Sequence, residues 1–177
     1  RCRIVSEHGW ADLVGPTVCR TLTPDEVAVV RGKLGPDPLN ADADPGQFYR
    51  AAAKSSRPIG VILMDQAAIS GVGNIFRAES LYRQKIDPLR PGKTLSDDEL
   101  RRLWDDNKHL LTIGVRVGRI ITTEQQDRPG IPETEAWPDH ANYVYMRHGQ
   151  KCPRCSATIR MEEIAGRKLY WCPGCQK

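Results

Sequence analysis

Cys152-Pro153-Arg154-Cys155 and Cys172-Pro173-Gly174-Cys175 are two Cys-x2-Cys pairs in the last 26 residues of a 177-residue chain. Thiolates are good zinc ligands, and two such pairs presented by a hairpin can supply a closed tetrahedral site of four cysteines. The segment between the pairs, residues 156–171, is long enough for two short strands with a turn at Ala165-Gly166. We therefore expect one structural Zn²⁺ ion with no open position for catalysis. The alternative is a pair of disulfides or unrelated buried thiols.

Positive charge is concentrated around this array. The chain has a net charge of +4, and residues 143–177 hold seven Lys or Arg against two Glu, a net of +5, so the remainder sums to −1. The seven are Arg147, Lys151, Arg154, Arg160, Arg167, Lys168 and Lys177. A basic stretch built around a zinc hairpin is typical of a domain that binds a polyanion. Solubility alone would not concentrate the charge on one small module.

The composition argues against a membrane or secreted protein. The hydrophobic fraction of 40% is enough for a core, but there is no apolar run of about 18 residues that could span a bilayer. The polar start Arg1-Cys2-Arg3 is unlike a signal peptide. Cys2 and Cys19 are expected to be ordinary buried thiols, and reduced thiols beside a zinc array favour a cytosolic location.

The first residues predict one strand without a partner. Arg1 to Val5 alternates polar and apolar side chains, and residues 9–20, with Gly15-Pro16, are interpreted as a connector. A lone strand is not stable, and the first Met of the chain is Met64. We therefore expect a fragment that begins in the last strand of an upstream domain.

Helix signals follow in series through the middle of the chain. Thr23 and Glu26 form a capping box with Pro24 at the first helical position, and Ser96 and Glu99 form a second box. The expected helices cover residues 27–34, 45–54, 59–64, 74–84 and 97–121. The last helix has an apolar stripe of Leu100, Leu103, Trp104, Leu111, Val115 and Ile120. The pattern predicts a mainly α-helical domain ahead of the zinc hairpin.

Residues 122–141 form a polar, Pro-rich segment without periodicity. A loop of about twenty residues inside a compact protein is unusual, and such loops are functional or disordered. The segment is therefore either a mobile surface loop or a lid over a site.

Gly71-Val72-Gly73-Asn74 opens one of the expected helices. Two glycines around one residue allow a sharp turn whose backbone N–H groups point outward at a helix N-terminus. That arrangement suits a phosphate, and Asn74 can add a side-chain donor. Taken alone the signal is weak, because Gly-x-Gly before a helix is often only a turn.

Together with the zinc array, this turn resembles one family. The Gly71–Asn74 turn and Glu79 begin a helix, a long capped helix follows, and Val144-Tyr145-x-Arg147 precedes the terminal four-cysteine hairpin. This order is similar to the C-terminal half of the formamidopyrimidine-DNA glycosylase/endonuclease VIII family, in which a helix–two-turn–helix domain precedes a zinc finger. The resemblance covers about residues 23–177. Arg1 to Val5 would match the end of the family's N-terminal β-sandwich.

The resemblance implies four segments along the chain. They are the end of an absent N-terminal β-sandwich with its linker (1–20), the helix–two-turn–helix DNA-binding domain (21–121), the polar loop (122–142) and the β-hairpin zinc finger with its four cysteines (143–177). In some family members a segment at the place of this loop covers the everted base.

The resemblance also implies which residues bind DNA. In the family the Gly-x-Gly-Asn turn binds backbone phosphate beside the lesion, a role that falls here on Gly71, Gly73 and Asn74. An Arg five residues before the third cysteine, here Arg167, reaches the phosphates that flank the damaged nucleotide and is assigned a part in δ-elimination. Because a guanidinium hardly gives up a proton near neutral pH, we interpret Arg167 as a phosphate clamp.

Lys54 and Arg57 precede the turn in a basic stretch. Each is either a further phosphate contact or a solvated surface charge. Arg77-Ala78-Glu79 favours the endonuclease VIII side of the family, and hence oxidised pyrimidines as substrates.

The family's catalytic centre finds no match in this sequence. Its nucleophile is the α-amine of an N-terminal Pro, which forms a Schiff base at the sugar C1′, whereas this chain begins Arg1-Cys2-Arg3. We expect the intact protein to be a DNA glycosylase and AP lyase that removes oxidised bases by β,δ-elimination, and this chain alone to be inactive. Its expected partner is double-stranded DNA with a damaged or abasic site, bound by a monomer in a bacterial cytoplasm at the nucleoid.

Two other functions compete with this interpretation. The chain could be a zinc-containing nucleic-acid-binding module that does not prefer damaged DNA. It could also be a zinc domain that binds proteins, but such a domain needs no surface charge of +5.

Overall fold

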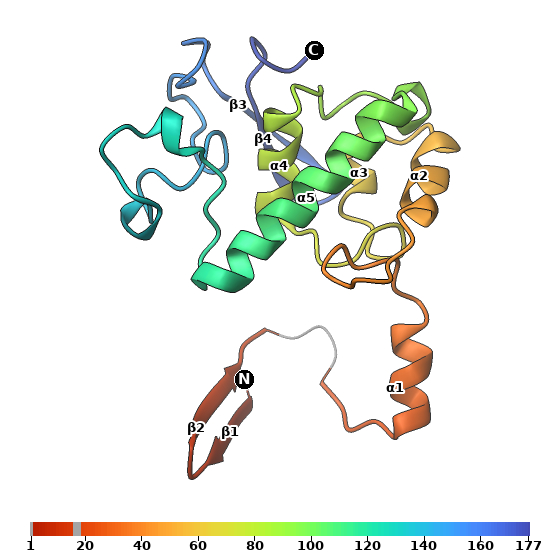
Figure 1. Cartoon of the computed structure of the whole chain (residues 1–177). Coiled ribbons are helices and arrows are strands. Elements are labelled where there is room, and N and C mark those ends of the chain that lie inside the picture. Colours follow the sequence, from red (N-terminus) through yellow and green to blue (C-terminus); the bar gives the residue numbers. More distant parts are fainter. Residues whose placement is uncertain (1, 16–18) are drawn as a thin grey trace. The chain divides into compact units, whose positions relative to one another are not determined.

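The computed structural model describes residues 2–15 and 19–177, and these fall into two compact units, residues 1–33 and 34–177. The first unit holds a β-hairpin and helix α1, and the second holds the other helices and strands (Figure 1). Among the described residues, no helix combines the length and the apolar character that crossing a bilayer requires.

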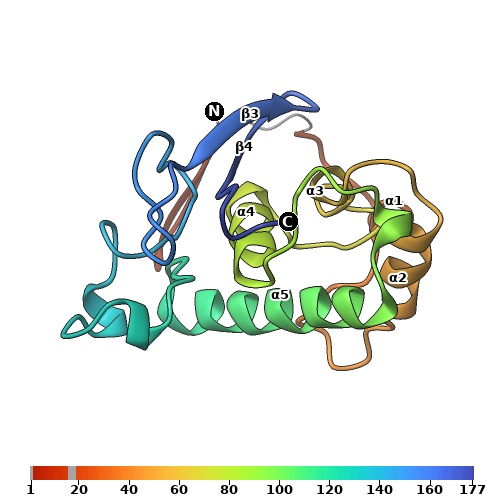
Figure 2. The ribbon, with the colours of Figure 1, turned by 90° about the horizontal axis from the view of Figure 1, so that it is seen from above.

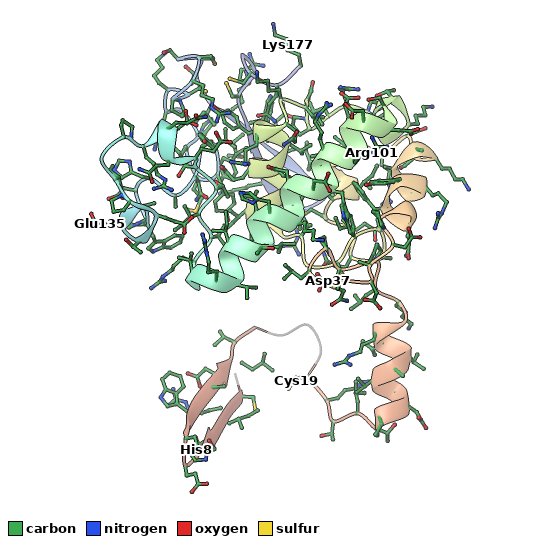
Figure 3. The ribbon with its side chains drawn as sticks, in the orientation of Figure 1. His8, Cys19, Asp37, Arg101, Glu135 and Lys177 are labelled. Carbon is green, nitrogen blue, oxygen red and sulfur yellow. The ribbon has the colours of Figure 1, made fainter. Side chains whose placement is uncertain are left out.

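The first unit opens with an antiparallel hairpin of β1 (Cys2–Ser6) and β2 (Gly9–Leu13), with His8 in the turn (Figure 3). Arg3 forms an ion pair with Asp12 at 2.7 Å, and its guanidinium lies 4.5 Å from the ring centre of Trp10. The prediction of a strand without a partner is therefore wrong, because the first half of the expected connector is that partner. Arg1 and Pro16, which belong to those predictions, lie outside the described residues.

Helix α1 (Pro24–Arg31) begins as the capping box predicts. The Glu26 N–H donates to the Thr23 hydroxyl at 3.3 Å, and the Thr23 N–H donates to the Glu26 carboxylate at 2.8 Å. The helix ends at Arg31 and not at Leu34, and none of its residues is buried. Cys2 and Cys19 are exposed as well, so the expectation of buried thiols at these positions is wrong.

The second unit is built around helix α4, which lies between helix α5 and the β3–β4 hairpin (Figure 2). Its elements are α2 (Gly46–Ala53), α3 (Ile59–Ile62), α4 (Asn74–Arg83), α5 (Asp97–Val117), β3 (Arg160–Ile164) and β4 (Arg167–Trp171), with 3-10 turns at Gly92–Thr94, Gln125–Asp127 and Glu133–Glu135. All the predicted helices of this unit are present, although α3, predicted over residues 59–64, is a single turn.

Two buried clusters hold the second unit together. One joins the helices and includes Phe48, Ile62 and Leu103, each with no exposed surface. The other lies between α4 and the zinc hairpin and includes Tyr82 and Ile159. Burying apolar side chains of this size contributes about 1.5–3 kcal/mol each, so α4 is fixed on both of its sides.

Helix α5 ends four residues earlier than predicted. Ser96 and Glu99 form the expected capping box, but Gly118 adopts a left-handed conformation with φ 68° and ends the helix after Val117. Glycine reaches this conformation without the steric cost that a Cβ imposes. The predicted stripe is correct at its first four positions, whereas Val115 is 73% exposed and Ile120 lies beyond the helix.

The polar loop at 122–141 is fastened at its base. The Thr122 N–H donates to the Ala141 carbonyl at 2.8 Å, and the Thr122 hydroxyl donates to Glu79 of α4 at 2.5 Å. Ala136 and Ala141 form a small buried cluster with Ile121. The segment therefore has a packed base of its own, which its lack of sequence periodicity does not reveal.

Candidate nucleic-acid interface and metal centre

The four cysteines of the array come together at the end of the β3–β4 hairpin. Their sulfur atoms all lie within 4.8 Å of one another, with 3.8 Å between Cys152 and Cys175 and 3.3 Å between Cys155 and Cys172. Tetrahedral zinc–sulfur bonds of about 2.3 Å place the sulfurs about 3.8 Å apart. All four are free thiols and not disulfides, so this donor set fits one zinc ion with a closed shell.

Each Cys-x2-Cys pair forms a tight turn. The Ser156 N–H donates to the Cys152 carbonyl and the Gln176 N–H donates to the Cys172 carbonyl, both at 3.0 Å. Gly174 lies against the other pair, since a Cβ at this position would be only 2.8 Å from the sulfur of Cys155. Glycine is therefore required at position 174, because a side chain there would clash with the sulfur of Cys155.

A tyrosine of α4 reaches the metal centre. The hydroxyl of Tyr82 lies 3.2 Å from the sulfur of Cys152, and both residues are buried. The Tyr82 ring stacks on Tyr143 with 4.8 Å between ring centres. Burial disfavours the Cys152 thiolate and so raises the pKa of this cysteine. Hydrogen bonding by Tyr82 and by the N–H groups of Arg154 and Cys155 outweighs burial, and the pKa is lowered to about 7.

A groove of about 270 Å³ lies at the opposite end of α4, beneath the tip of the hairpin. Three arginines line it: Arg57 from the segment before α3, Arg77 from α4 and Arg167 from the start of β4. Its only lining carboxylate among the described residues is Asp65, which forms an ion pair with Arg57 at 3.0 Å. The groove therefore holds excess positive charge.

Arg77 is the buried member of this set, with 1% of its surface exposed. Its guanidinium donates to the carbonyls of Gly60 at 3.3 Å and Lys168 at 3.1 Å, and to the side-chain oxygen of Asn74. Its Nε has no hydrogen-bond partner among the described residues. Burial and the charge of Arg167 lower the pKa of Arg77 to about 10, so it remains a cation at neutral pH.

The Gly-x-Gly-Asn turn is formed as predicted, but its donors are not all free. Gly71 has φ 83°, and its N–H donates to the Gln66 side chain at 3.0 Å, so this amide already has a partner and is not a free donor as expected. Gly73 is the N-cap of α4, and no side chain caps this end of the helix within the described part of the chain. The amide of Asn74 donates to the Lys168 carbonyl at 3.0 Å, which leaves its second N–H available.

Glu79 fastens the middle of α4 to the zinc finger. The consecutive N–H groups of Tyr143, Val144 and Tyr145 donate to its carboxylate at 2.7–2.8 Å, beside the hydroxyl of Thr122. Burial raises the pKa of Glu79, and these four hydrogen bonds oppose that rise. Glu79 is thus an anchor for the backbone that enters the zinc finger.

Two other basic residues named above, Lys54 and Arg154, do not line the groove. Lys54 caps the C-terminus of α2, is exposed and does not line the groove. Arg154, part of the basic stretch, forms ion pairs with Asp127 at 2.6 Å and Glu124 at 3.4 Å, so its charge is neutralised within the protein. The positive charge that faces outward is therefore smaller than the count for residues 143–177 indicates.

Arg77 is the groove residue that sequence reasoning did not assign to DNA binding. The signal was present, because Arg77 follows Asn74 by three residues on the same helix, and residues with this spacing share a face. Its burial could not be predicted, because it depends on the hairpin strand that covers it.

Two family models match the chain. The formamidopyrimidine-DNA glycosylase H2TH domain matches residues 34–126, and the zinc finger found in FPG and IleRS matches residues 149–177.

Curated relatives match over most of this chain. Endonuclease 8 1 of Mycobacterium tuberculosis is 44% identical over 177 residues, covering 99% of this chain and 65% of its own length. Formamidopyrimidine-DNA glycosylase of Thermus thermophilus is 38% identical over 150 residues, covering 81% of this chain and 54% of its own length. The chain thus spans between about half and two thirds of the length of these relatives.

The chain is also similar to solved structures of this family. The Lactococcus lactis Fpg in complex with DNA containing an abasic site has a TM-score of 0.70 and 28% identity, over 88% of this chain and 57% of that chain. The complex of the same protein with FAPY-dG-containing DNA has a TM-score of 0.69 and 29% identity, over 87% and 56%.

Proposed function

The chain belongs to the formamidopyrimidine-DNA glycosylase/endonuclease VIII family, and from this premise we propose that it is the DNA-binding half of a base-excision-repair glycosylase. Its role is to hold damaged duplex DNA through phosphate contacts made at the N-terminal end of α4. The observation that carries this proposal is the arginine groove, in which Arg77 and Arg167 lack a carboxylate partner among the described residues.

A phosphodiester matches the chemistry of this groove. It is a compact monoanion that accepts several hydrogen bonds, and guanidinium groups supply donors in a planar fork that suits its oxygens. Arg167 at the hairpin tip and the free N–H of Asn74 can approach one phosphate from two sides, while the uncapped start of α4 adds its positive dipole end. Arg77 contributes a charge beneath them, because its own position is fixed by the Gly60 and Lys168 carbonyls.

In the chemistry of the intact protein, Arg167 would act on the leaving phosphate. A β,δ-elimination expels phosphate groups on both sides of the damaged sugar, and negative charge grows on each as it leaves. A guanidinium held at the hairpin tip stabilises that charge without giving up a proton. The nucleophile that attacks C1′ has no assigned residue in this chain.

The lesion is proposed to be an oxidised pyrimidine. Support comes from the Arg77-Ala78-Glu79 motif and from the M. tuberculosis relative, whose name is Endonuclease 8 1. The relatives named above are bacterial, which supports a place for this protein at a bacterial nucleoid. We also propose that it acts as a monomer.

The experiment is a salt titration of binding to two otherwise identical duplexes, one of which carries a stable abasic-site analogue. Affinity should fall with salt for both, because phosphate contacts release counterions. Tighter binding to the abasic duplex is expected if this half of the protein takes part in recognising the lesion. Equal affinity would favour the second candidate, a zinc-containing module that binds DNA without damage preference, which the groove alone also allows.

A further inference from the structure

The hydroxyl of Tyr82 is positioned to act on the zinc centre. It lies 3.2 Å from the sulfur of Cys152, and Tyr82 and Cys152 are 1% and 2% exposed. Among the described residues, no other side chain apart from the cysteines themselves hydrogen-bonds to a sulfur of the cluster. The contact is therefore specific to one ligand and shielded from water.

The direction of this hydrogen bond follows from the chemistry of the site. A cysteine that binds zinc is a thiolate and has no proton to donate, so the tyrosine hydroxyl must be the donor. Four thiolates around Zn²⁺ leave a net charge of −2, which a buried site can hold only if donors surround the sulfurs. The Tyr82 hydroxyl is such a donor to Cys152.

We propose that Tyr82 is an outer donor to the zinc centre that strengthens metal binding through its hydroxyl and not only through its ring. Tyr82 is a positioning residue in this role, because it acts through Cys152. The inference is independent of DNA binding. It assigns α4 a group for the metal near the end of the helix.

A simpler role for Tyr82 is to fill the core between α4 and the zinc finger. Its ring stacks on Tyr143 and belongs to the buried cluster of that interface. Replacing Tyr82 with Phe keeps the ring and removes only the hydroxyl, so this variant separates the two roles.

Tyr143 provides a matched control within the same stack. Its hydroxyl donates to Asp127 and accepts from the Glu124 N–H at 2.8 Å and from Arg154 at 3.1 Å, and within the described part of the chain it makes no hydrogen bond to a cysteine. Tyr143→Phe therefore removes a buried hydroxyl next to the same ring without touching a sulfur.

The test uses the zinc-loaded full chain and a competing chelator. Loss of an outer hydrogen bond to a metal ligand typically costs 10- to 100-fold in metal affinity. We expect zinc affinity to fall about tenfold or more in Tyr82→Phe and to stay near wild type in Tyr143→Phe. Cobalt-substituted protein gives an independent readout, because the thiolate-to-cobalt charge-transfer bands should shift in Tyr82→Phe alone.

Three results would overturn the proposal. Wild-type zinc affinity with an unshifted cobalt spectrum in Tyr82→Phe would show that the hydroxyl has no influence on the metal. Equal weakening in both variants would assign the effect to the tyrosine stack. A Tyr82→Phe protein that is unfolded at saturating zinc, judged by circular dichroism, would place the role of the hydroxyl in the fold. None of these readouts involves DNA, so the proposed function is tested separately.

Discussion

The two ends of helix α4 differ in how their polar groups are satisfied. Near the start, Arg77 and Arg167 face a groove without a carboxylate of their own in the described part of the chain. Farther along, Glu79 receives four hydrogen bonds and Tyr82 reaches a cysteine sulfur. A buried cation without a counter-ion lowers stability. The difference therefore separates a ligand-binding end from a scaffold end, and three predictions test that separation.

The largest effect on stability is expected from removing a zinc ligand at the scaffold end. Cys172→Ser removes one of four zinc ligands, and structural zinc sites contribute about 10–16 kcal/mol of apparent folding free energy. We expect loss of zinc and collapse of the β3–β4 hairpin, because no side chain of β3 is fully buried. Metal analysis and amide chemical shifts of residues 149–177 would measure both.

The control for this variant is Cys19→Ser, which changes a cysteine that is exposed and distant in sequence from the array. It should retain zinc and leave the hairpin shifts unchanged. A Cys172→Ser protein that keeps its zinc and its hairpin shifts would contradict the ligand assignment.

A smaller loss of stability is expected from changing Glu79, which fastens α4 to the zinc finger. Glu79→Gln places an amide NH₂ where backbone N–H groups now donate, so at least one buried donor loses its acceptor. Such a loss costs about 1–3 kcal/mol, and more when the acceptor was charged. We expect the urea midpoint of unfolding to fall accordingly, while the exposed change Glu162→Gln on β3 leaves it unchanged. An unchanged midpoint in Glu79→Gln would mean that the scaffold end does not depend on this network.

The sequence predicts the short-range features of this structure but not the long-range contacts at either end of α4. The zinc ligands, the capping boxes and the Ala165-Gly166 turn depend on short-range patterns, and the structure has the capping boxes and the turn where the sequence predicts them. The roles of Arg77 and Glu79 depend on partners 91 and 64–66 residues away, Lys168 and residues 143–145. No local pattern encodes such contacts.

Two predictions about secondary structure were wrong, the missing partner of the first strand and the end of α5, and each has a local cause. The sequence did not reveal β2 because its five residues, Gly9–Leu13, begin with Gly and contain Asp12, both poor strand formers. It placed the end of α5 too late because the apolar stripe continues past the point where Gly118 stops the helix. Pairing with β1 determines β2, and the left-handed conformation of Gly118 determines the end of α5. The hydrophobic periodicity of the sequence shows neither.

The smallest effect, and the one confined to the ligand-binding end, is expected from the exposed cation at the hairpin tip. Arg167→Ala should weaken binding to an abasic duplex about tenfold with little change in fold, because each phosphate contact to a charged donor is worth about 1.5–3 kcal/mol at most. The slope of log affinity against log salt should fall by about 0.9, the value for one lost phosphate contact. Lys54→Ala is the matched control, since it removes an exposed cation that does not line the groove, and it should leave the slope unchanged. Equal losses in the two variants would show that DNA responds to net charge alone, and the two ends of α4 would then no longer differ in the way proposed.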